Sequence, residues 1–423
     1  KTVQVIPHVT NEIKNRIQRL DKEYDIIITE VGGTVGDIEG LPFLESVRQL
    51  RLDIGYENTL NILLTYVPYI KSAGELKTKP SQHSAYKLRE IGIQPDVLLC
   101  RSEKPFEEEI YSKIALFTNV KRENVINAID VDCVYEIPLN FQKAKLPEII
   151  CQHFKLEQRP IVMNEWLHFL HNRENAEEVV TIAVCGKYVQ HQDAYKSIGE
   201  ALIHAGASLM KRVKIIWIDS EHNFLEEEIA TMLNGVQGIL VPGGFGVRGI
   251  EGKIVFTKYA RENNIPYLGI CLGMHVAVIE CARDLCNLVD ANSTEFNEET
   301  LAPVIHLIKD QVYQKRIGGS MRLGAYDCHL DKGSKAYQAY QTETISERHR
   351  HRYEFNNDYR EIIQKAGLKI SGLSPDNYLV EIVEYPDLDF FIAVQFHPEF
   401  KSRPTNPHPL FREFIKAASL KKP

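Results

Sequence analysis

Cys271 is the residue of this sequence best placed to act as a nucleophile. It stands in "GICLGMH", between a β-branched apolar run, "IPYLGI", and an apolar helical pattern, "HVAVIECA", with glycines at positions 269 and 273. This spacing predicts a sharp strand-to-helix turn that exposes the residue at its apex, the thiol counterpart of the G-x-S-x-G nucleophile elbow. The dipole at the start of the helix favours the thiolate. The alternative is a small buried cysteine in a tight turn.

A thiolate nucleophile needs a proton acceptor, and His397 is the strongest candidate. It follows the apolar run "FFIAVQF" near the C-terminus, and Glu399 comes two residues later. Because side chains two apart on an extended strand share a face, we expect Glu399 to orient the His397 ring while that ring takes the thiol proton. Most histidines in a set of 15 have no catalytic role. The position at a strand end, beside Pro398, is what favours this one.

A glycine-rich stretch, "GILVPGGFGVRGIEG", allows two interpretations. Gly244, Gly246 and Gly249 match G-x-G-x-x-G after a strand, which would indicate a dinucleotide site. Pro242 interrupts the passage from strand to turn, however, and "GIEG" is not expected to begin a clean helix. We therefore favour a loop whose backbone N–H groups stabilise an oxyanion beside Cys271.

Carboxylates and lysines within the first 80 residues indicate a nucleotide site. "EVGGTVGDIEG" contains no G-K-[ST], so it is not a phosphate loop by its own pattern. Glu30 ends the apolar run "YDIIITE", and Asp37 and Glu39 follow a flexible turn; carboxylates at this edge of a parallel sheet lie where nucleotides and Mg²⁺ bind. In "AGELKTKPSQHS", Lys77 and Lys79 could face one phosphate chain. Ordinary loop carboxylates and a surface lysine pair are the alternatives.

The elements that must position these residues alternate between strand and helix. The chain has 423 residues, more than one hydrophobic core usually serves, so two domains are expected. Continuous β-branched runs between amphipathic patterns predict an α/β fold of two domains, each a mostly parallel sheet flanked by helices. "VQVIP", "YDIIITE" and "DVLLCRS" are predicted strands of the first domain. The expected boundaries are residues 1–157, a polar linker at 158–178, and residues 179–423.

Composition excludes several other classes of protein. The formal charge of −7 argues against binding of a nucleic acid polymer, which needs a basic surface. No apolar run reaches the roughly 18 residues that span a bilayer, and the first residues lack the pattern of a signal peptide. The eight cysteines include no C-x-x-C pair, which indicates reduced thiols and no zinc site. These features predict a cytoplasmic protein without membrane contact.

Residues 179–423 resemble the class I glutamine amidotransferases in "PGGFG", "GICLGMH" and "FHPE", and "ANSTEF", "GGSMRLG" and "RHRHRYEFNN" narrow the resemblance to the CTP synthase family. It implies that Cys271, His397 and Glu399 form a triad that releases ammonia from glutamine. It also implies that Gly244 and Leu272 form an oxyanion hole, and that Glu295 and Arg352 bind the α-amino and α-carboxylate groups of glutamine. The full implied glutamine site is Gly244, Leu272, Gly273, Met274, His275, Glu295 and Arg352. His275 stands where the family usually has Gln. For Arg352 the alternative is a solvated basic run, the interpretation adopted for the other charges of "RHRHR".

The first region resembles the P-loop-like amidoligase domain of the same family. The resemblance implies Glu30 as a Mg²⁺ ligand. The implied UTP and CTP site is Asp37, Ile38, Glu39, Lys77, Thr78, Lys79, Pro80, Ser81, Gln82 and Lys113. The implied ATP contacts are Arg101, Ile129, Asp130 and Val131.

The implied reaction is the ATP-dependent amination of UTP to CTP, with GTP as activator, CTP as feedback inhibitor and a homotetramer that could form filaments. The family's amidoligase domain begins with a glycine- and lysine-containing phosphate loop and a second Mg²⁺-binding aspartate, which this sequence lacks. It begins at Lys1 rather than Met, so we expect a missing N-terminal segment. Two rivals therefore stay open: a glutamine hydrolase of the same fold, and a module that binds nucleotide or assembles with partners without completing the ligase step.

Overall fold

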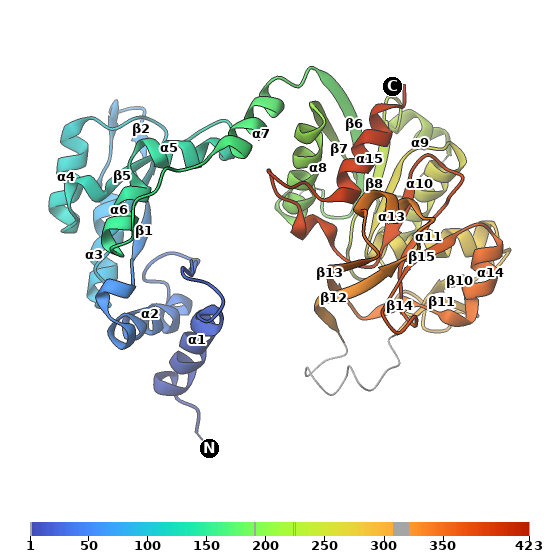
Figure 1. Cartoon of the computed structure of the whole chain (residues 1–423), viewed down its shortest axis with the longest axis horizontal. Coiled ribbons are helices and arrows are strands. Elements are labelled where there is room, and N and C mark those ends of the chain that lie inside the picture. The colour runs from blue at the N-terminus through green and yellow to red at the C-terminus, as the bar shows by residue number, and fades with distance from the viewer. Residues whose placement is uncertain (1, 190–191, 223, 225, 308–320, 423) are drawn as a thin grey trace. The chain divides into compact units, whose positions relative to one another are not determined.

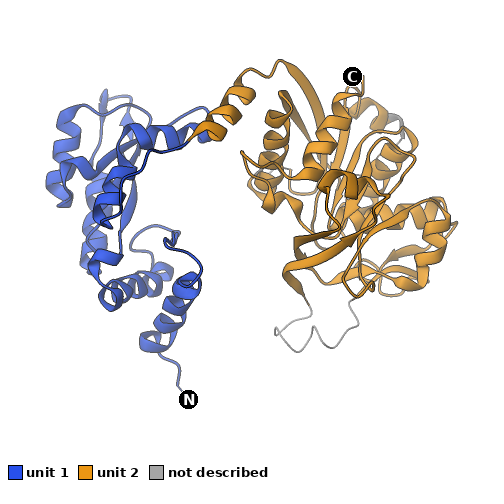
Figure 2. Cartoon of the chain, in the orientation of Figure 1, with its two compact units in different colours: residues 1–162 blue, residues 163–423 orange. Residues whose placement is uncertain are grey.

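The computed structural model describes residues 2–189, 192–222, 224, 226–307 and 321–422. It divides into two compact units, Lys1–Val162 and Met163–Pro423, which Figure 2 shows in different colours. Both units are α/β, with parallel strands flanked by helices, as the alternating patterns predict. The expected linker contains a helix, α7 (Asn164–Glu174), which belongs to the second unit.

A parallel sheet of order β1-β4-β5 organises the first unit (Figure 1). Helices α3 and α4 supply Leu88 and Ile114 to the core on one face, and α6 supplies Leu146 to the other. Because both faces are covered, the central strand β4 is apolar along most of its length. The bounds are β1 (Ile62–Tyr66), β4 (Val97–Ser102), β5 (Val125–Ile129), α1 (Thr10–Ile17), α2 (Leu41–Ile54), β2 (Tyr69–Ile70), β3 (Glu75–Leu76), α3 (Lys79–Glu90), α4 (Glu108–Thr118), α5 (Ile137–Lys143) and α6 (Leu146–His153).

Two strands predicted in the first unit are wrong. "VQVIP", residues 3–7, overlaps an irregular turn, Val5–Val9, in which Ile6 has extended backbone angles. Residues 26–30 lie in no strand, and Ile28 is 93% exposed. A β-branched run forms a strand only where a neighbouring strand accepts its backbone hydrogen bonds. Among the described residues, no strand pairs with either run, so local propensity alone does not decide the structure there.

A mixed sheet of order β13-β12-β15-β16-β17-β9-β8-β6-β7 organises the described part of the second unit. The portion from β7 to β17 is parallel, and β16, β15, β12 and β13 extend it in antiparallel fashion. The strands are β6 (Glu178–Gly186), β7 (Lys211–Asp219), β8 (Gly238–Val241), β9 (Tyr267–Ile270), β12 (Arg322–Leu330), β13 (Thr344–His351), β15 (Lys369–Leu373), β16 (Val380–Glu384) and β17 (Phe391–Val394), with β10 (Ala291–Ser293), β11 (Ala302–Leu307) and β14 (Tyr353–Phe355) in a smaller sheet.

Helices cover both faces of the parallel portion. Alternate residues of β6 enter two cores: Ala183 packs with α10 and α11, whereas Ile182 packs with α8 and α15. This double burial explains why these strands read as continuous apolar runs. The α-helices in the described part of this unit are α7, α8 (Lys196–Ser208), α9 (Glu226–Met232), α10 (Ile250–Glu262), α11 (Leu272–Asp284), α13 (Lys335–Tyr340), α14 (Arg360–Lys365) and α15 (Pro409–Ser419).

The carboxyl ends of three neighbouring parallel strands carry the candidate chemistry. The glycine-rich loop follows β8, Cys271 follows β9, and His397 follows β17. These strands are adjacent in the sheet, so segments more than 100 residues apart in sequence meet at one edge. Ligands of open α/β sheets bind at this edge.

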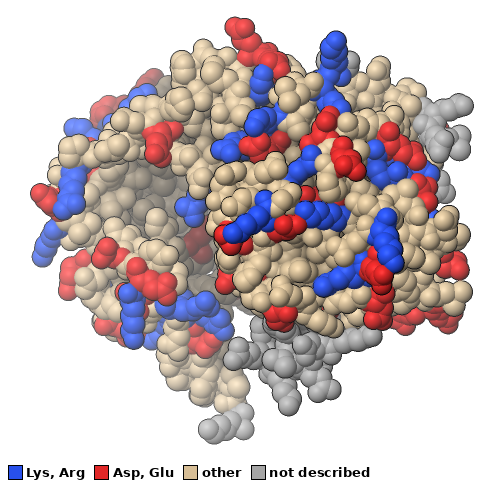
Figure 3. All heavy atoms as spheres, turned by 45° about the vertical axis from the view of Figure 1, so that its right-hand side comes forward, with Lys and Arg blue, Asp and Glu red and all other residues tan. Residues whose placement is uncertain are grey.

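The surface carries both signs of charge. On the face shown in Figure 3, Lys and Arg side chains are interspersed with Asp and Glu. Within the described residues, every helix is too short or too polar to cross a bilayer.

Candidate active site

The turn at Cys271 is a strained elbow between β9 and α11. Cys271 has φ 50° and ψ −99°, a region that side-chain-bearing residues seldom adopt. A Cβ atom at Gly273 would lie 2.3 Å from the Val241 carbonyl oxygen, and one at Gly269 would lie 2.8 Å from the Gly273 oxygen. Both glycines are therefore required by close backbone approach, as the G-x-C-x-G spacing predicts.

His397 and Glu399 meet through a turn rather than along a strand. The His397 Nδ1 atom lies 2.8 Å from Glu399 Oε1, and the His397 N–H donates to the Arg348 carbonyl at 2.8 Å. Strand β17 ends at Val394, and Glu399 lies in a 3₁₀ turn, Pro398–Lys401. The expectation of an extended strand was wrong here, because Pro398 begins the turn, yet the contact itself is present.

Cys271 changes the pKa of the His397 ring. Burial by itself would lower the pKa of His397, but the charge and hydrogen bond of Cys271 oppose it, followed by those of Glu399, and together raise the pKa to about 10. The ring is thus held as a cation beside the sulfur. A Cβ atom at Gly243 would lie 2.8 Å from His397 Cε1 and 3.5 Å from Cys271 Cβ. Gly243 was missed in the sequence; its place between the proline and the second glycine of "PGGFG" was the available signal.

The glycine-rich loop after β8 lies against the start of α11. A Cβ atom at Gly244 would lie 3.3 Å from Leu272 Cδ2. Lys187 Nζ donates to the Phe245 carbonyl, and the Gly246 N–H donates to Glu295 Oε1 at 2.8 Å. The loop is held by these contacts from the residue after β6 and from the segment after β10.

Contrary to expectation, "GIEG" begins a helix, α10. Gly249 caps it with φ 73°, and a Cβ atom at Gly252 would lie 2.3 Å from the Ser220 carbonyl oxygen. The close packing of Gly252 against Ser220 is a tertiary contact that local propensity does not report.

Glu295 and Arg352 lie within electrostatic reach of each other. Burial raises the pKa of Glu295, while the Gly246 N–H, Lys187 and Arg352 each act to lower it. Arg352 is exposed, between β13 and β14. A carboxylate and a guanidinium at one end of a site suit the ammonium and carboxylate of an amino acid.

His275 is directed away from solvent and toward Gln395. Its Nε2 atom lies 2.9 Å from Gln395 Oε1, and the Gln395 amide lies 3.9 Å from Cys271 Sγ. Burial lowers the pKa of His275 to about 4, so the ring is neutral. Gly273 and Met274, which also belong to the predicted glutamine site, are buried. Gln395 was not identified from the sequence.

The motif "RHRHR" does not lie wholly in solvent. Arg348 and Arg350 are exposed, as expected, but His349 and His351 are buried, and burial lowers the pKa of both rings. Successive side chains of strand β13 point to opposite faces, so the arginines lie on the exposed face and the histidines on the buried face. Residues 318–320 of "GGSMRLG" lie outside the described residues; Arg322, in the same motif, forms a buried ion pair with Glu381 at 2.5 Å.

In the first unit, predicted nucleotide residues gather at the start of α3. Ser81 Oγ donates to the Tyr66 carbonyl at 3.0 Å, which anchors this helix at the carboxyl end of β1. Thr78 and Ser81 are buried, and Gln82 bonds to Thr78 Oγ1 at 3.0 Å. Lys79 and Pro80 occupy the first turn, with Lys79 exposed. A helix start with a cation beside it is a good setting for an anion.

Lys77 and Lys113 both lie close enough to the Glu75 carboxylate to act on it. Lys77 forms an ion pair with Glu75, and both lysines lower the pKa of that carboxyl, with Lys77 acting more strongly. Lys113 comes from α4, so two segments supply cations here.

The predicted ATP residues lie at the ends of β4 and β5. Arg101 Nε donates to Asp130 Oδ1 at 2.7 Å, and the Asp130 N–H donates to the Ser102 carbonyl at 2.9 Å. Ile129 ends β5, and Val131 follows Asp130.

Glu30, Asp37, Ile38 and Glu39 are exposed, and within the described part of the chain no hydrogen bond or ion pair joins their side chains to the other candidates. Among the described residues, no three His, Cys, Asp or Glu side chains gather closely enough to hold a metal ion by themselves. A single carboxylate such as Glu30 still fits Mg²⁺, which commonly takes one or two protein carboxylates together with substrate phosphates.

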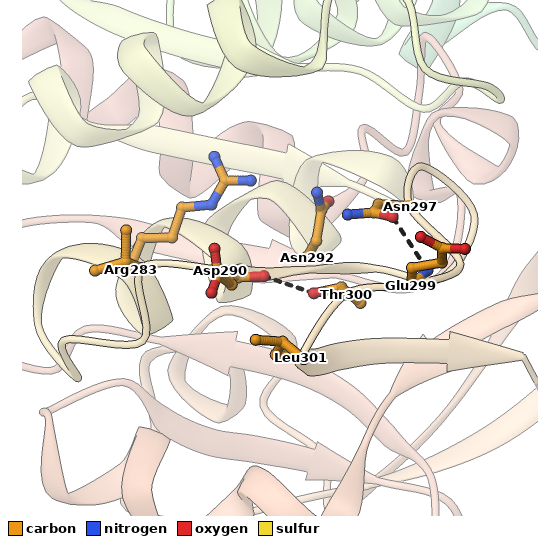
Figure 4. A pocket seen from close by; sticks show the side chains of 8 residues that line it. Arg283, Asp290, Asn292, Asn297, Glu299, Thr300 and Leu301 are labelled. Atoms are coloured by element: carbon orange, nitrogen blue, oxygen red, sulfur yellow. Dashed lines mark hydrogen bonds between the residues drawn. The ribbon is translucent and has the colours of Figure 1, made fainter.

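A separate hollow lies beside the end of α11 (Figure 4). Thr300 Oγ1 donates to the Asp290 carbonyl at 2.5 Å across it. Its lining contains none of the residues predicted to form the catalytic or binding sites, although Asn292 belongs to the motif "ANSTEF"; the lining residues are Arg283, Val289, Asp290, Asn292, Asn297, Glu299, Thr300 and Leu301.

Comparison with known proteins gives two family matches. Residues 1–156 match the family described as CTP synthase N-terminus, and residues 190–417 match glutamine amidotransferase class-I. A CTP synthase of Bacillus subtilis (strain 168) is 52% identical over 419 residues, which cover 99% of this chain and 78% of that protein. A CTP synthase of Halalkalibacterium halodurans is 54% identical over 423 residues, covering 100% of this chain and 79% of the relative.

A solved structure resembles the second unit. It is the glutaminase domain of Trypanosoma brucei CTPS with bound acivicin. The alignment has a TM-score of 0.54 and 43% sequence identity, and it covers 57% of this chain and 95% of that chain. Together with the full-length relatives and both domain matches, this shows that the chain belongs to the CTP synthase family of glutamine-dependent ligases.

Proposed function

We propose that this chain hydrolyses glutamine with Cys271, His397 and Glu399 and uses the ammonia to convert UTP to CTP. The observation that supports it most is the Cys271 elbow beside a His397 ring whose pKa is raised and whose Nδ1 atom contacts Glu399. A thiolate paired with an imidazolium is the resting state of a cysteine nucleophile.

The chemistry follows from this pair. The Cys271 thiolate attacks the side-chain amide carbon of glutamine, and the oxyanion that forms is stabilised by the N–H groups of Gly244 and Leu272. His397 donates its proton to the leaving nitrogen, which departs as ammonia and leaves a thioester on Cys271. Water, deprotonated by the now neutral His397, then attacks the thioester carbon; glutamate is released, and the Cys271 thiolate and the His397 cation are restored.

Glu295 and Arg352 would hold the two charged groups of glutamine, Glu295 the ammonium and Arg352 the carboxylate. Arg352→Lys is expected to raise the KM for glutamine about tenfold with a smaller change in kcat, because a point ammonium cannot replace the planar fork. Glutamate release at varied glutamine concentration measures this. Arg348→Lys, an exposed neighbour on β13, is the matched control. An unchanged KM in Arg352→Lys would remove this residue from the carboxylate site.

In the first unit, the start of α3, Lys113 and the ends of β4 and β5 would bind the nucleotides, with Asp37, Ile38 and Glu39 beside UTP. ATP phosphorylates the uracil O4 oxygen and leaves as ADP; ammonia then attacks C4 and phosphate departs, giving CTP. Glu30 would be a ligand of Mg²⁺, which when bound neutralises charge on the phosphates. The assignments at the start of α3 and at the ends of β4 and β5 rest on family resemblance and on positions at the carboxyl edge of the sheet. Those of Glu30, Asp37, Ile38 and Glu39 rest on family resemblance alone.

Lys79→Met is expected to raise the KM for UTP about tenfold, because it removes a cation from the first turn of α3. CTP formation with ammonium chloride as nitrogen donor measures the effect without involving the glutamine site; UTP-dependent stimulation of glutamine hydrolysis is a second measurement. Lys87→Met, exposed on the same helix and paired with Glu90, is the control. Equal KM values for both variants would place Lys79 outside the UTP site.

The ligase proposal itself is tested by supplying UTP, ATP and MgCl₂ with either glutamine or ammonia. CTP should form from both nitrogen donors. Glutamine hydrolysis without CTP from either donor would instead favour the glutaminase or the nucleotide-binding module. By family resemblance we also propose GTP activation, CTP feedback inhibition, a homotetramer capable of filament assembly and a cytoplasmic location.

A further inference from the structure

Lys253 is a fully buried lysine with no hydrogen-bond partner among the described residues. It lies near the start of α10, its side chain is 0% exposed, and its Nζ atom makes no hydrogen bond. Burying an unpaired ammonium is costly, so such a residue is rare unless a nearby charge repays the cost in some state of the protein. Ordinary packing would be served as well by methionine or leucine.

The Lys253 ammonium lies against the loop proposed to form the oxyanion hole. A Cβ atom at Gly244 would lie 3.8 Å from Lys253 Nζ, and the same atom would lie 3.3 Å from Leu272 Cδ2. Lys187 also approaches this loop, but it donates to the Phe245 carbonyl and so has a fixed partner. Lys253 is therefore the cation beside the loop whose Nζ atom is left unpaired in the described structure.

The groups that act on Lys253 come from β6 and β9 and the residues that directly follow these two strands. Burial lowers its pKa most, Lys187 lowers it further, and Cys185 and Cys271 raise it, with a result of about 7. Burial raises the pKa of the Cys185 thiol far above neutrality, so this sulfur stays uncharged. On β9, the Tyr267 hydroxyl faces Thr257 of α10, and burial raises the pKa of Tyr267 as well. Of the two sulfurs that raise the pKa of Lys253, Cys271 is therefore the one that also belongs to the proposed triad.

We propose that Lys253 is a positioning residue for the amidotransferase reaction, whose charge stabilises the negative charge that passes between the Cys271 sulfur and the oxyanion at Gly244. It touches neither substrate nor sulfur and acts through space and through the loop. The proposal rests on the proposed glutaminase function of Cys271. It predicts that the benefit depends on the protonation of the lysine and is large only where the lysine is charged.

The sign of the pH dependence follows. Below about pH 7 Lys253 carries its charge and assists the thiolate; as pH rises through 7 the proton leaves and the assistance fades. The ratio of kcat/KM for glutamine between the unmodified protein and Lys253→Met should therefore be about tenfold at pH 6 and within about twofold at pH 8.5. The rate of Cys271 alkylation by iodoacetamide, corrected for the Cys271→Ala background, should show the same trend.

The controls separate this role from a structural one. Lys258→Met, farther along α10 and only partly buried, should leave both profiles unchanged, and thermal unfolding should show Lys253→Met to be at least as stable as the unmodified protein. If Lys253→Met does not fold, Lys253→Gln keeps the polarity and tests the same charge. A ratio that is independent of pH, or no loss at pH 6, would overturn the proposal. Glutamine hydrolysis that survives Cys271→Ala would instead overturn the proposed function, so the two failures are distinguishable.

Discussion

Cys271→Ala is expected to reduce glutamine hydrolysis by at least about 10³-fold, because the substitution removes the atom that forms the covalent intermediate. Glutamate release measures the loss. CTP formation from free ammonia should remain within about twofold of the unmodified protein, since ammonia does not need the elbow. The alanine is smaller than the cysteine and takes over a backbone conformation that the surrounding packing already enforces.

The control for this substitution is Cys286→Ala, which removes a half-buried thiol just beyond α11 and should leave both activities unchanged. Loss of the ammonia-dependent reaction together with glutamine hydrolysis in Cys271→Ala would indicate a structural cysteine. Retention of both would show that another residue is the nucleophile.

His397→Ala is expected to lower kcat for glutamine hydrolysis about 10³-fold and to lower the rate of Cys271 alkylation at pH 6. The pKa of His397 is raised to about 10 by Cys271 and Glu399 against the opposing effect of burial, so the ring stays positively charged through neutral pH. Removing this cation leaves the thiolate without its partner, and the alkylation profile should move to higher pH.

The activity of Glu399→Gln should lie between that of His397→Ala and that of the unmodified protein, because the variant keeps the ring but loses one of the charges that raise its pKa. We expect a loss of about 10- to 100-fold and an alkylation profile shifted in the same direction as in His397→Ala, by less. His329→Ala, an exposed histidine on β12, is the control. An alkylation rate at pH 6 that is the same in His397→Ala as in the unmodified protein would contradict the ion pair.

The buried His275 ring contacts a residue that lies beside the nucleophile. The family usually has Gln at this position, and here the buried imidazole contacts Gln395, whose amide approaches the Cys271 sulfur. A neutral ring with its proton on Nε2 donates to Gln395 Oε1 and so turns the amide N–H toward the sulfur. His275 is thus connected to the nucleophile through Gln395, which the position after "CLGM" alone did not indicate.

The sequence by itself determined the elbow, because the two glycines and the β-branched run before Cys271 are local requirements of one strand-to-helix turn. It also determined the fold class, since double burial of parallel strands leaves continuous apolar runs that are visible without coordinates. The burial of His349 and His351 on β13 likewise follows from the period-two alternation of a strand with one buried face.

Only the tertiary structure decided the rest. Lys253 and Gly243 acquire their significance from β6, β8, β9 and β17 meeting at one edge, which no local pattern reports. Residues 26–30 have strong β propensity and yet form no strand, because strand formation depends on a partner rather than on the run itself. Contacts between segments distant in sequence fix burial and electrostatic environment, and these set the pKa values of His397 and Lys253 on which the proposed chemistry depends.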